Sequence, residues 1–381
     1  MRIGIDIGKA LGALDGIGRY TRGLLVGLGE LEASLPAAER VEYRLYPLFR
    51  CDVVVERESL LPPGARGFSF AERAAPVPGE VDLFHATAWA VPAAWRGPLA
   101  LTLYDLTFLT LPATHTAENR AHCSVGLARA LARGGALCAI SESVGAEARA
   151  LGVAEERVAL APPGVDARFA PQSAEAIERA CRELGVEGSY VLSIGTHEPR
   201  KNLAGLLEAW RLLPEALRGR HRLVLAGAAG WAGAPGEEPL ARAVERLGLD
   251  AEVRRLGAVA DRLLPGLYAG ASAFVYPSLG EGFGLPPLEA MACGVPVVAS
   301  DRPAIPEAVG DAAELCDPTS PQRLAAAIAR VLDDPERAEE MRVAGRERAR
   351  RFTWRATAEA LRAAWSGALE APDTGGARCA T

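Results

Sequence analysis

The stretch Glu281-Gly-Phe-Gly-Leu-Pro-Pro-Leu-Glu-Ala-Met-Ala-Cys-Gly294 decides the fold, because it joins a glycine-rich turn to a short helix. Pro286 and Pro287 suit the first helical positions, where a missing N–H costs nothing, and Gly294 ends the helix. Free backbone N–H groups and the positive end of the helix dipole gather at such a turn, which therefore predicts an anion site. Glu281 stands on the turn and Glu289 on the helix. Taken alone, two glutamates in this arrangement are more typical of a solvated helix start.

The length and the charge of the chain limit its possible functions. A chain of 381 residues is too long for one ordinary core and indicates two domains. The 42 basic and 48 acidic residues give a net charge of −6, which argues against nucleic acid as the partner. Lys9 and Lys201 are the two lysines of an arginine-rich chain, so each hints at a local need for that side chain.

The cysteines and the apolar runs indicate where such a chain would work. Seven cysteines are scattered, odd in number and never spaced as Cys-x-x-Cys, so neither a disulfide framework nor a zinc site is indicated. No apolar run reaches about 18 residues, so we expect no membrane span. Residues 1–8 read as a first strand rather than as a leader. Together these features favour a cytoplasmic protein.

Strand and helix patterns alternate in both halves of the chain. Short apolar runs bounded by turn residues predict buried parallel strands at 3–7, 41–49, 81–85, 99–103, 137–140 and 158–161, and then at 190–194, 222–226, 253–256, 273–276 and 295–300. Helical patterns lie between these runs. Right-handed crossovers should therefore build two doubly wound α/β sheets.

The division into domains follows from this alternation. We expect an N-terminal domain at 1–170 and a C-terminal domain at 171–353. A terminal amphipathic helix at 354–371 should cross back and pack on the first domain, and residues 372–381 should form a disordered tail.

The loop at residues 8–18 follows the first strand and precedes a helix expected from Arg19. It contains Lys9, Gly16 and Gly18, and a strand, a glycine loop and a helix in this order are the phosphate-side layout of an α/β domain. Glycines also make tight turns with no ligand, so this layout alone is a weak signal.

Polar residues also follow two later strands of the first half. His85 ends one strand, while Tyr104 and Asp105 follow another. Ligands of open α/β sheets bind outside the carboxyl ends of strands, so Asp105 and His85 are candidates to line a cleft. Alternatively, His85 is a hydrogen-bonded histidine that ties its strand to a loop.

The helix expected at 115–133 carries arginines beside its apolar face, at positions 120, 129 and 133. Such a helix can lie on an anionic membrane surface, although a solvated helix face is the more common case.

Arg200, Lys201 and Asn202 stand between a strand and a helix expected at 203–213. Arginine can fork onto two oxygens and lysine can act as a point charge, so the pair can neutralise a diphosphate without a metal. Alone, this segment is typical of a capped surface helix. With Glu281 and its helix at the edge of the same predicted sheet, a diphosphate site becomes the favoured interpretation.

Three segments of the second half closely resemble family 4 retaining glycosyltransferases of the GT-B fold. They are Gly-Thr-His-Glu-Pro-Arg-Lys-Asn-Leu (195–203), the run from Pro277 to Val298 and Glu-Ala-Val-Gly-Asp-Ala-Ala (307–313). The first half is less similar, but Gly-Ile-Gly-Arg-Tyr (16–20) and Leu-Tyr-Asp-Leu (103–106) resemble the mannosyl- and rhamnosyltransferase branch. The resemblance implies an α/β protein with two Rossmann-like domains facing across a cleft.

The resemblance also implies which residues bind the donor, a nucleotide diphosphate sugar. Arg200 and Lys201 would bind the diphosphate. Glu281 would accept hydrogen bonds from the donor sugar, and Glu289 would hold the ribose hydroxyls. The other implied donor contacts are Thr196, Gly282, Phe283, Gly284 and Leu285 near the sugar and phosphates, Gly257 and Val259 near the nucleobase, and Gly16 and Gly18 from the opposite domain. The family's reaction needs no protein nucleophile, so we expect neither a cofactor nor a metal.

The sequence departs from the family at Tyr104, where many members carry a histidine near the donor sugar. Any role given to that histidine is therefore open here. Tyr104 and His85 are possible contacts to sugar or acceptor, and Asp105 joins Glu281, Arg200 and Lys201 as the expected catalytic set.

The resulting expectation is a retaining, metal-independent transfer of a hexose to a hydroxyl of a glycan or lipid-linked glycan, in assembly of a surface polysaccharide or related glycan. Branch resemblance favours GDP-mannose as the donor. The protein would be cytoplasmic, with peripheral contact to the inner membrane surface as an option. Three alternatives stay open: a transferase that uses a UDP-sugar, a nucleotide-sugar epimerase, and a catalytically silent partner of another transferase.

Overall fold

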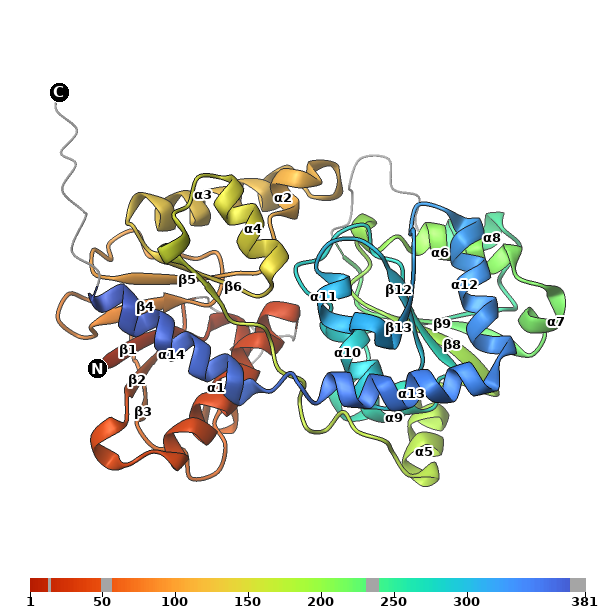
Figure 1. The fold of residues 1–381 in the computed structure, drawn as a ribbon, viewed down its shortest axis with the longest axis horizontal. Coiled ribbons are helices and arrows are strands. Elements are labelled where there is room, and N and C mark those ends of the chain that lie inside the picture. Colours follow the sequence, from red (N-terminus) through yellow and green to blue (C-terminus); the bar gives the residue numbers. More distant parts are fainter. Residues whose placement is uncertain (13–14, 49–56, 231–239, 371–381) are drawn as a thin grey trace. The chain divides into compact units, whose positions relative to one another are not determined.

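The computed structural model describes residues 1–12, 15–48, 57–230 and 240–370 (Figure 1). The chain forms two compact units. The first comprises residues 1–106, 117–164 and 353 onward, and the second comprises 107–116 and 165–352. The tail expected at 372–381 lies outside the described residues.

The first unit is built on a seven-stranded sheet in which every neighbouring pair is parallel. Its strands, in the order β3-β2-β1-β4-β5-β6-β7, are Phe68–Phe70, Glu42–Tyr46, Arg2–Asp6, Leu83–Ala86, Leu99–Leu103, Ala136–Ala139 and Val158–Leu160. The central strands β1, β4 and β5 are almost wholly buried, as their continuous apolar runs predict.

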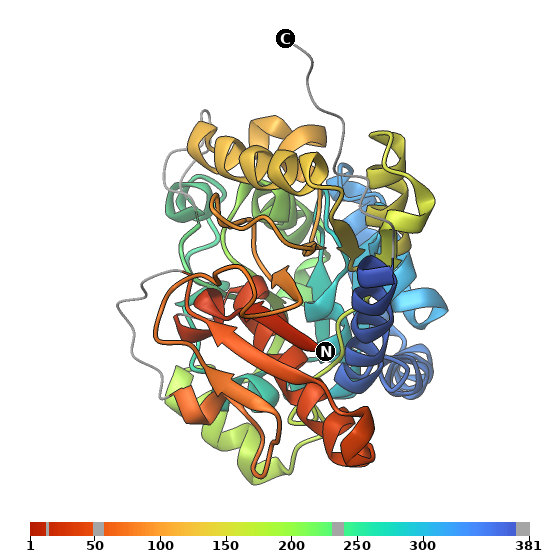
Figure 2. The same ribbon diagram turned by 90° about the vertical axis from the view of Figure 1, so that its left-hand side faces the viewer.

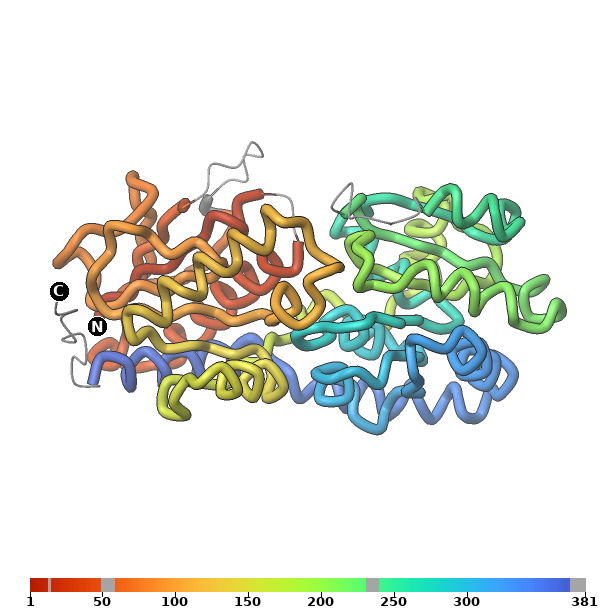
Figure 3. The backbone as a smooth tube through the Cα atoms, turned by 90° about the horizontal axis from the view of Figure 1, so that it is seen from above, coloured from red at the N-terminus to blue at the C-terminus, as the bar shows by residue number. Residues whose placement is uncertain are grey.

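The C-terminal helix α14 (Trp354–Glu370) belongs to the first unit, where it packs on α1 (Gly16–Ser34) and on β5, β6 and β7 (Figures 2 and 3). Two glycines of α1 make this approach possible. A Cβ on Gly23 would lie 2.0 Å from the indole of Trp354, and one on Gly27 would lie 2.1 Å from its carbonyl oxygen. The predicted return of the last helix to the first domain is confirmed.

The second unit is built on a six-stranded parallel sheet in the order β10-β9-β8-β11-β12-β13. The strands are Val253–Gly257, His221–Ala226, Ser189–Ile194, Ala273–Tyr276, Val297–Ser300 and Ala313–Cys316. Its helices are α5 to α13, at Ala174–Leu184, Leu203–Leu212, Glu215–Arg218, Leu240–Arg246, Leu264–Ala269, Leu285–Ala292, Ile305–Val309, Pro321–Asp333 and Pro335–Ala349. Helices α6 and α12 pack together over a core centred on Trp210 and Ile328.

Both sheets have a topological switch point, where the strand order reverses. In the first sheet this point lies between β1 and β4, and in the second between β8 and β11. The loops that leave two such strands run to opposite faces of the sheet and leave a crevice between them, which is where ligands of doubly wound folds bind. The predicted fold of two doubly wound, Rossmann-like domains is confirmed.

Several local expectations were wrong. Helix α1 begins at Gly16 rather than Arg19, because Asp15 caps it by accepting a hydrogen bond from the N–H of Gly18 at 2.8 Å. Strand β3 is absent from the predicted strands. Residues 107–116, which include α2 (Thr107–Thr110), cluster with the second unit, although they lie within the first domain expected at 1–170.

Candidate functional site

The second sheet brings together two loops that are about 80 residues apart in the sequence. Strands β8 and β11 are neighbours, so the loop after β8, with Arg200 and Lys201, meets the loop after β11, with Ser278 and Glu281. The two loops are joined at Arg200: the N–H of Leu279 donates to its carbonyl oxygen at 2.7 Å, and Ser278 Oγ lies 2.9 Å from the same oxygen. The predicted cations and carboxylate therefore share one site at the switch point.

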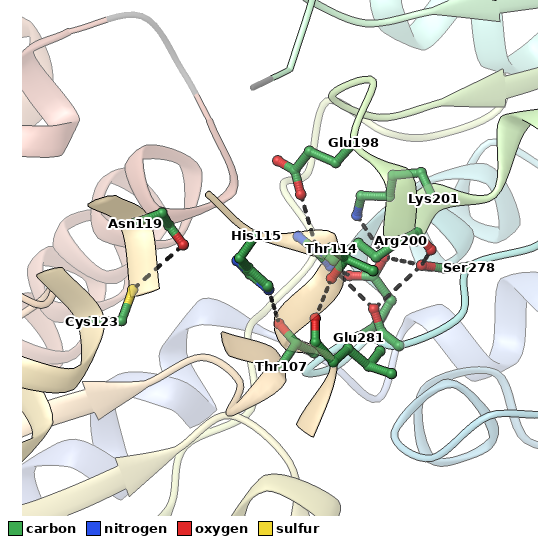
Figure 4. A network of polar contacts seen from close by, with 12 residues as sticks. Thr107, Thr114, His115, Asn119, Cys123, Glu198, Arg200, Lys201, Ser278 and Glu281 are labelled. Carbon is green, nitrogen blue, oxygen red and sulfur yellow. Dashed lines mark hydrogen bonds and ion pairs between the residues drawn. The ribbon is translucent and has the colours of Figure 1, made fainter. Parts of the chain in front are cut away.

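The carboxylate of Glu281 is the centre of this site, and its side chain is only 9% exposed. Its Oε1 accepts hydrogen bonds from Lys201 Nζ and Ser278 Oγ, both at 2.6 Å, and its Oε2 accepts one from the Arg200 guanidinium at 2.7 Å (Figure 4). Arg200 also donates to Glu198 at 2.8 Å, and Lys201 donates to the hydroxyl of Tyr276 at 2.9 Å. The result is a buried, closed network of two cations and two carboxylates.

Burial and charge act in opposite directions on this network. Burial by itself raises the pKa of Glu281, but Arg200 and Lys201 outweigh it, so the pKa falls to about 2. Burial, followed by the neighbouring Arg200, lowers the pKa of Lys201, against the opposing effect of Glu281. Glu281 therefore stays ionised at neutral pH and pairs with both cations.

The helix α10 begins directly after this turn, as the prolines predict. Gly284, with φ of 122°, makes the turn into the helix, and a Cβ there would lie 3.0 Å from Ile305 Cδ1. Gly282 and Phe283 are buried, and the ring of Phe283 packs edge-on against Phe352 at 5.3 Å between centroids. The side chain of Phe283 is thus committed to the core, which leaves its backbone for any ligand contact.

Glu289 lies one turn into α10 and is 6% exposed. Its Oε2 accepts a hydrogen bond from the hydroxyl of Tyr268 at 2.9 Å, which fixes the carboxyl group. A carboxylate can accept further hydrogen bonds from its other lone pairs, so its predicted contact with ribose hydroxyls stays a prediction.

The residues predicted around the nucleobase and sugar lie at the same edge of the second sheet. Thr196 is half-buried in the loop after β8, and Leu285 is the half-buried first residue of α10. Gly257 ends β10 with φ of 66°, and its carbonyl accepts a hydrogen bond from Gly227 N–H at 2.8 Å. Gly257 is exposed and Val259 is half-buried, so both are accessible at the carboxyl end of the strand.

Gly16 and Gly18 lie in the first unit, in the first turn of α1. The N–H of Gly18 already donates to the Asp15 cap, and Lys9 Nζ forms an ion pair with the same carboxylate at 2.9 Å. Their predicted approach to the diphosphate stays a prediction.

Asp105 follows β5 in the first unit and is half-buried, so it does not share a unit with Glu281. Its charge contributes, after burial, to a raised pKa of Glu147 on α4 (Glu142–Ala150) and of Cys123 on α3 (Ala117–Ala132). Asp105 therefore adds negative charge at the carboxyl end of the first sheet.

His85 is not a ligand-facing residue, which corrects the expectation that it lines a cleft. It is fully buried on β4, where one ring nitrogen pairs with Thr102 Oγ1 at 2.8 Å. The other, Nδ1, accepts a hydrogen bond from Trp365 Nε1 of α14 at 3.0 Å. Burial lowers the pKa of His85 to about 3, so it is a neutral core residue that anchors the last helix.

Tyr104 is also bound within the first unit. Its hydroxyl donates to the carbonyl of Thr87 at 2.6 Å, and its ring packs edge-on against Tyr20 at 5.4 Å. With 9% of the residue exposed, its proton is not available to a sugar in this conformation. This corrects the expectation that Tyr104 could offer its hydroxyl as a contact to sugar or acceptor.

The sequence did not lead us to predict three members of the second-unit network, which are Ser278, Glu198 and Tyr276. Ser278 and Glu198 stand within the segments that carry the family resemblance, so their position was a usable signal. Tyr276 ends an apolar strand, and nothing in its neighbourhood predicts that its hydroxyl accepts from Lys201.

Arg129 on α3 and Arg133, directly after that helix, both form hydrogen bonds within the fold. Arg129 donates to the carbonyl of Val91, and Arg133 donates to the carbonyls of Pro92 and Ala93. These hydrogen bonds account for both arginines, so neither residue requires contact with a membrane. In the described part of the chain, no helix is both long and apolar enough to cross one.

Comparisons with known proteins agree with this architecture. Residues 177–348 match the family described as Glycosyl transferases group 1. The O-antigen chain mannosyltransferase B of Escherichia coli is 37% identical over 256 residues, which are 66% of this chain and 66% of that protein.

Solved structures extend the likeness to nearly the whole chain. Anabaena Alr3699/HepE in complex with UDP-glucose aligns with a TM-score of 0.73 at 22% identity, covering 96% of this chain and 99% of that one. WaaG, a glycosyltransferase involved in lipopolysaccharide biosynthesis, aligns with a TM-score of 0.68 at 16% identity, covering 99% and 100%. At these identities the structures show the fold alone.

Two Rossmann-like units, the second with cations and a carboxylate at its switch point, define the GT-B class of protein. With the matched group 1 domain and these neighbours, the chain is a family 4-like GT-B glycosyltransferase.

Proposed function

We propose that this protein is a retaining mannosyltransferase that moves mannose from GDP-mannose to a hydroxyl of a glycan or lipid-linked glycan. The observation that carries the proposal is the network of Glu281 with Arg200 and Lys201 at the switch point of the second sheet. The likeness of this chain to an O-antigen mannosyltransferase supports mannose as the sugar and a polysaccharide as the product.

The chemistry proposed for this network is exchange of one anion for another. A bound diphosphate would take over contacts of Arg200 and Lys201 that Glu281 now makes, and both cations would stabilise the charge that develops on the leaving nucleotide. Glu281, released in part, would accept hydrogen bonds from donor-sugar hydroxyls. Because two cations are present in the site, we propose that no metal is needed.

The cytoplasm, with peripheral contact to the inner membrane face, is the proposed place of action. A lipid-linked glycan acceptor would be presented at that surface.

Thermal unfolding with GDP, UDP and dTDP and their sugar conjugates, with added magnesium or with EDTA, tests the donor. A ligand at 100 times its dissociation constant adds about 2.7 kcal/mol, which raises the melting temperature by a few degrees. A shift with GDP and GDP-mannose that survives EDTA supports the proposal. A shift with UDP-sugars only would favour the alternative suggested by HepE, which was solved with UDP-glucose.

Product analysis tests the reaction itself. Incubation of GDP-mannose with octyl α-mannoside should yield a disaccharide whose anomeric proton, observed by NMR from the first turnovers, has the configuration of the donor. An inverted product would contradict the retaining mechanism. Free mannose with no disaccharide from any mannoside offered would contradict the proposed acceptor class.

A further inference from the structure

The turn that carries Glu281 is also contacted by residues 107–116. This segment follows β5 in the chain, but it clusters with the second unit. Its contact with the turn is at Gly280. A Cβ on Gly280 would lie 2.6 Å from Leu111 Cδ1 and 3.4 Å from Thr107 Cγ2. Both side chains therefore pack on the backbone of Gly280, one residue before Glu281.

Gly280 is itself a member of the charge network. Its carbonyl oxygen accepts a hydrogen bond from Arg200 Nη1 at 3.2 Å, and the same nitrogen donates to Glu281 Oε2 at 2.7 Å. The backbone of Gly280 lies outside the left-handed region, so the close approach of Leu111 is what favours a glycine here. A shift of the Gly280 carbonyl would change the direction in which Arg200 points.

The segment presents these two side chains from a folded turn. The N–H of Leu111 donates to the carbonyl of Thr107 at 2.7 Å. Thr107 is 5% exposed, and its Oγ1 forms a hydrogen bond of 2.9 Å with His115 Nε2 (Figure 4). Oγ1 and Cγ2 of a threonine are attached to the same carbon, so this bond restrains the rotamer that directs Cγ2 toward Gly280.

We propose that Leu111 and Thr107 are positioning residues of the donor site. They hold Gly280 and, through its carbonyl oxygen, the guanidinium of Arg200 in the geometry that binds the diphosphate. Neither side chain contacts the ligand; both act through the turn. Such support matters because a binding group must stay within about 0.5 Å of its productive position. This inference rests on the proposed glycosyltransferase function and adds two residues that hold its diphosphate site.

The test is a double-mutant cycle with Leu111→Ala and Gly280→Ala in the full-length protein, with GDP affinity measured by calorimetry. Leu111→Ala removes the support, and Gly280→Ala adds a methyl group that pushes the Leu111 side chain away. Each single change should lower the affinity about 5-fold, within the range of coupling between residues in contact. In the Leu111→Ala background the added methyl group has room, so Gly280→Ala should cause no further loss there.

Two further variants separate positioning from general stability. Leu109→Ala is the matched control, because Leu109 lies on the same helix α2 but is 44% exposed. It should leave GDP affinity unchanged. Leu111→Met keeps an apolar side chain of similar volume and should retain most of the affinity. A purely structural role would lower the melting temperature of Leu111→Ala without changing its GDP affinity.

Thr107→Val gives a second way to test the inference if Gly280→Ala does not fold. It keeps the branched shape of the side chain but loses the hydrogen bond with His115. We expect GDP affinity to fall by about 2-fold or more, as for loss of one hydrogen bond that restrains the contact. Unchanged affinity in both Thr107→Val and Leu111→Ala would overturn the inference.

The outcomes of the cycle also separate this inference from the proposed function. Losses of GDP affinity that simply multiply in the double variant overturn the positioning role, even if the wild type transfers mannose normally. If the wild type binds no GDP, the same cycle is measured by melting temperature. Non-additive melting temperatures would then support the hold of Leu111 on Gly280 while the proposed donor fails, and additive ones would overturn both.

Discussion

At the switch point of the second unit, the carboxylate of Glu281 accepts hydrogen bonds from Lys201, Arg200 and Ser278, whereas that of Asp6, at the switch point of the first, accepts one from Gly8. Both groups are buried, and the strand order around them follows the same pattern. Only the partners differ: two buried cations hold the pKa of Glu281 at about 2, while burial raises that of Asp6 to about 7.

This difference in neighbouring charges sets the ionisation of each buried carboxyl group. Around Glu281 the cations are already ordered, so an anionic ligand meets preorganised partners at little further cost. Lys9, whose charge acts on Asp6, is 40% exposed and pairs with Asp15, so burial dominates the pKa of Asp6. One repeated architecture therefore holds an ionised carboxylate in one unit and a carboxyl group with a raised pKa in the other. The predictions below test that contrast.

Replacing Glu281 by Gln should have the largest effect. We expect the rate of sugar transfer to fall about 1,000-fold, in the range seen when a preorganised polar group of an active site is removed. The free protein should also lose stability, by about 3–5 kcal/mol, because Arg200 and Lys201 are left buried without their carboxylate. GDP should restore much of this loss, so its melting shift should exceed that of the wild type. Transfer assays and melting curves with and without GDP check this.

Glu314→Gln is the control for this prediction. Glu314 is a carboxylate of the same unit, on β13, and it pairs with Arg330 and Arg337. Its replacement should lower stability without changing transfer or the size of the GDP shift. Unchanged turnover in Glu281→Gln would show that the network is structural only.

Replacing His85 by Leu should affect stability and not binding. The indole N–H of Trp365 would lose its acceptor and Thr102 would lose a partner, at a cost of about 1–3 kcal/mol for a buried unsatisfied group. Chemical unfolding measures the loss, and a double-mutant cycle with Trp365→Phe should show coupling of roughly 0.5–3 kcal/mol. A variant that folds as stably as the wild type but loses sugar affinity would reinstate His85 as a ligand contact.

His85 also shows where the sequence stops being informative. The pattern places it correctly at the end of a buried strand, but its partner Trp365 lies 280 residues further on, so no local signal distinguishes an anchored histidine from a ligand-facing one. Likewise, the motifs predict Arg200, Lys201 and Glu281 as a site, yet their contact depends on β8 lying beside β11, which is a property of strand order.

The fold was largely predictable because buried parallel strands are continuous apolar runs. β5 and β11 have the predicted bounds, and the other predicted strands lie at or within a few residues of theirs. β3 and β13 were missed for different reasons. β3 has only three residues in a segment rich in proline and glycine, and β13 carries Glu314, whose charge is neutralised by arginines from later helices.

Replacing Lys201 by Met should weaken GDP binding by about 10- to 100-fold, the range for loss of a charge-assisted contact to phosphate. Calorimetric titration with GDP measures it. Lys201→Arg, which keeps the charge in a different shape, should recover part of the affinity. Equal GDP affinity in Lys201→Met would place the diphosphate elsewhere and remove the contrast between the two switch points.

The smallest effect concerns pH and Asp6. Because its pKa is about 7 in the folded protein and 3.8 in its ordinary state, the folded form holds an extra proton between these values. Stability from this group is therefore present at low pH and is lost as pH rises from about 4 to 7. Asp6→Asn lacks this dependence. The melting temperature of the variant minus that of the wild type should therefore be higher at pH 8 than at pH 5. A difference of about 1 kcal/mol in the free energy of unfolding corresponds to at least about 2–4 °C.

The other groups around Asp6 do not produce the same signal. Tyr104, whose charge acts on Asp6, titrates above this range, because burial raises its pKa. His85, with its pKa lowered to about 3, makes the protein less stable as pH falls below about 6.5, which is the opposite sign, and it does so in both proteins. The difference between the two melting curves thus isolates Asp6. A difference that does not change between pH 5 and pH 8 would mean that the fold does not raise the pKa of Asp6, and this contrast with Glu281 would be lost.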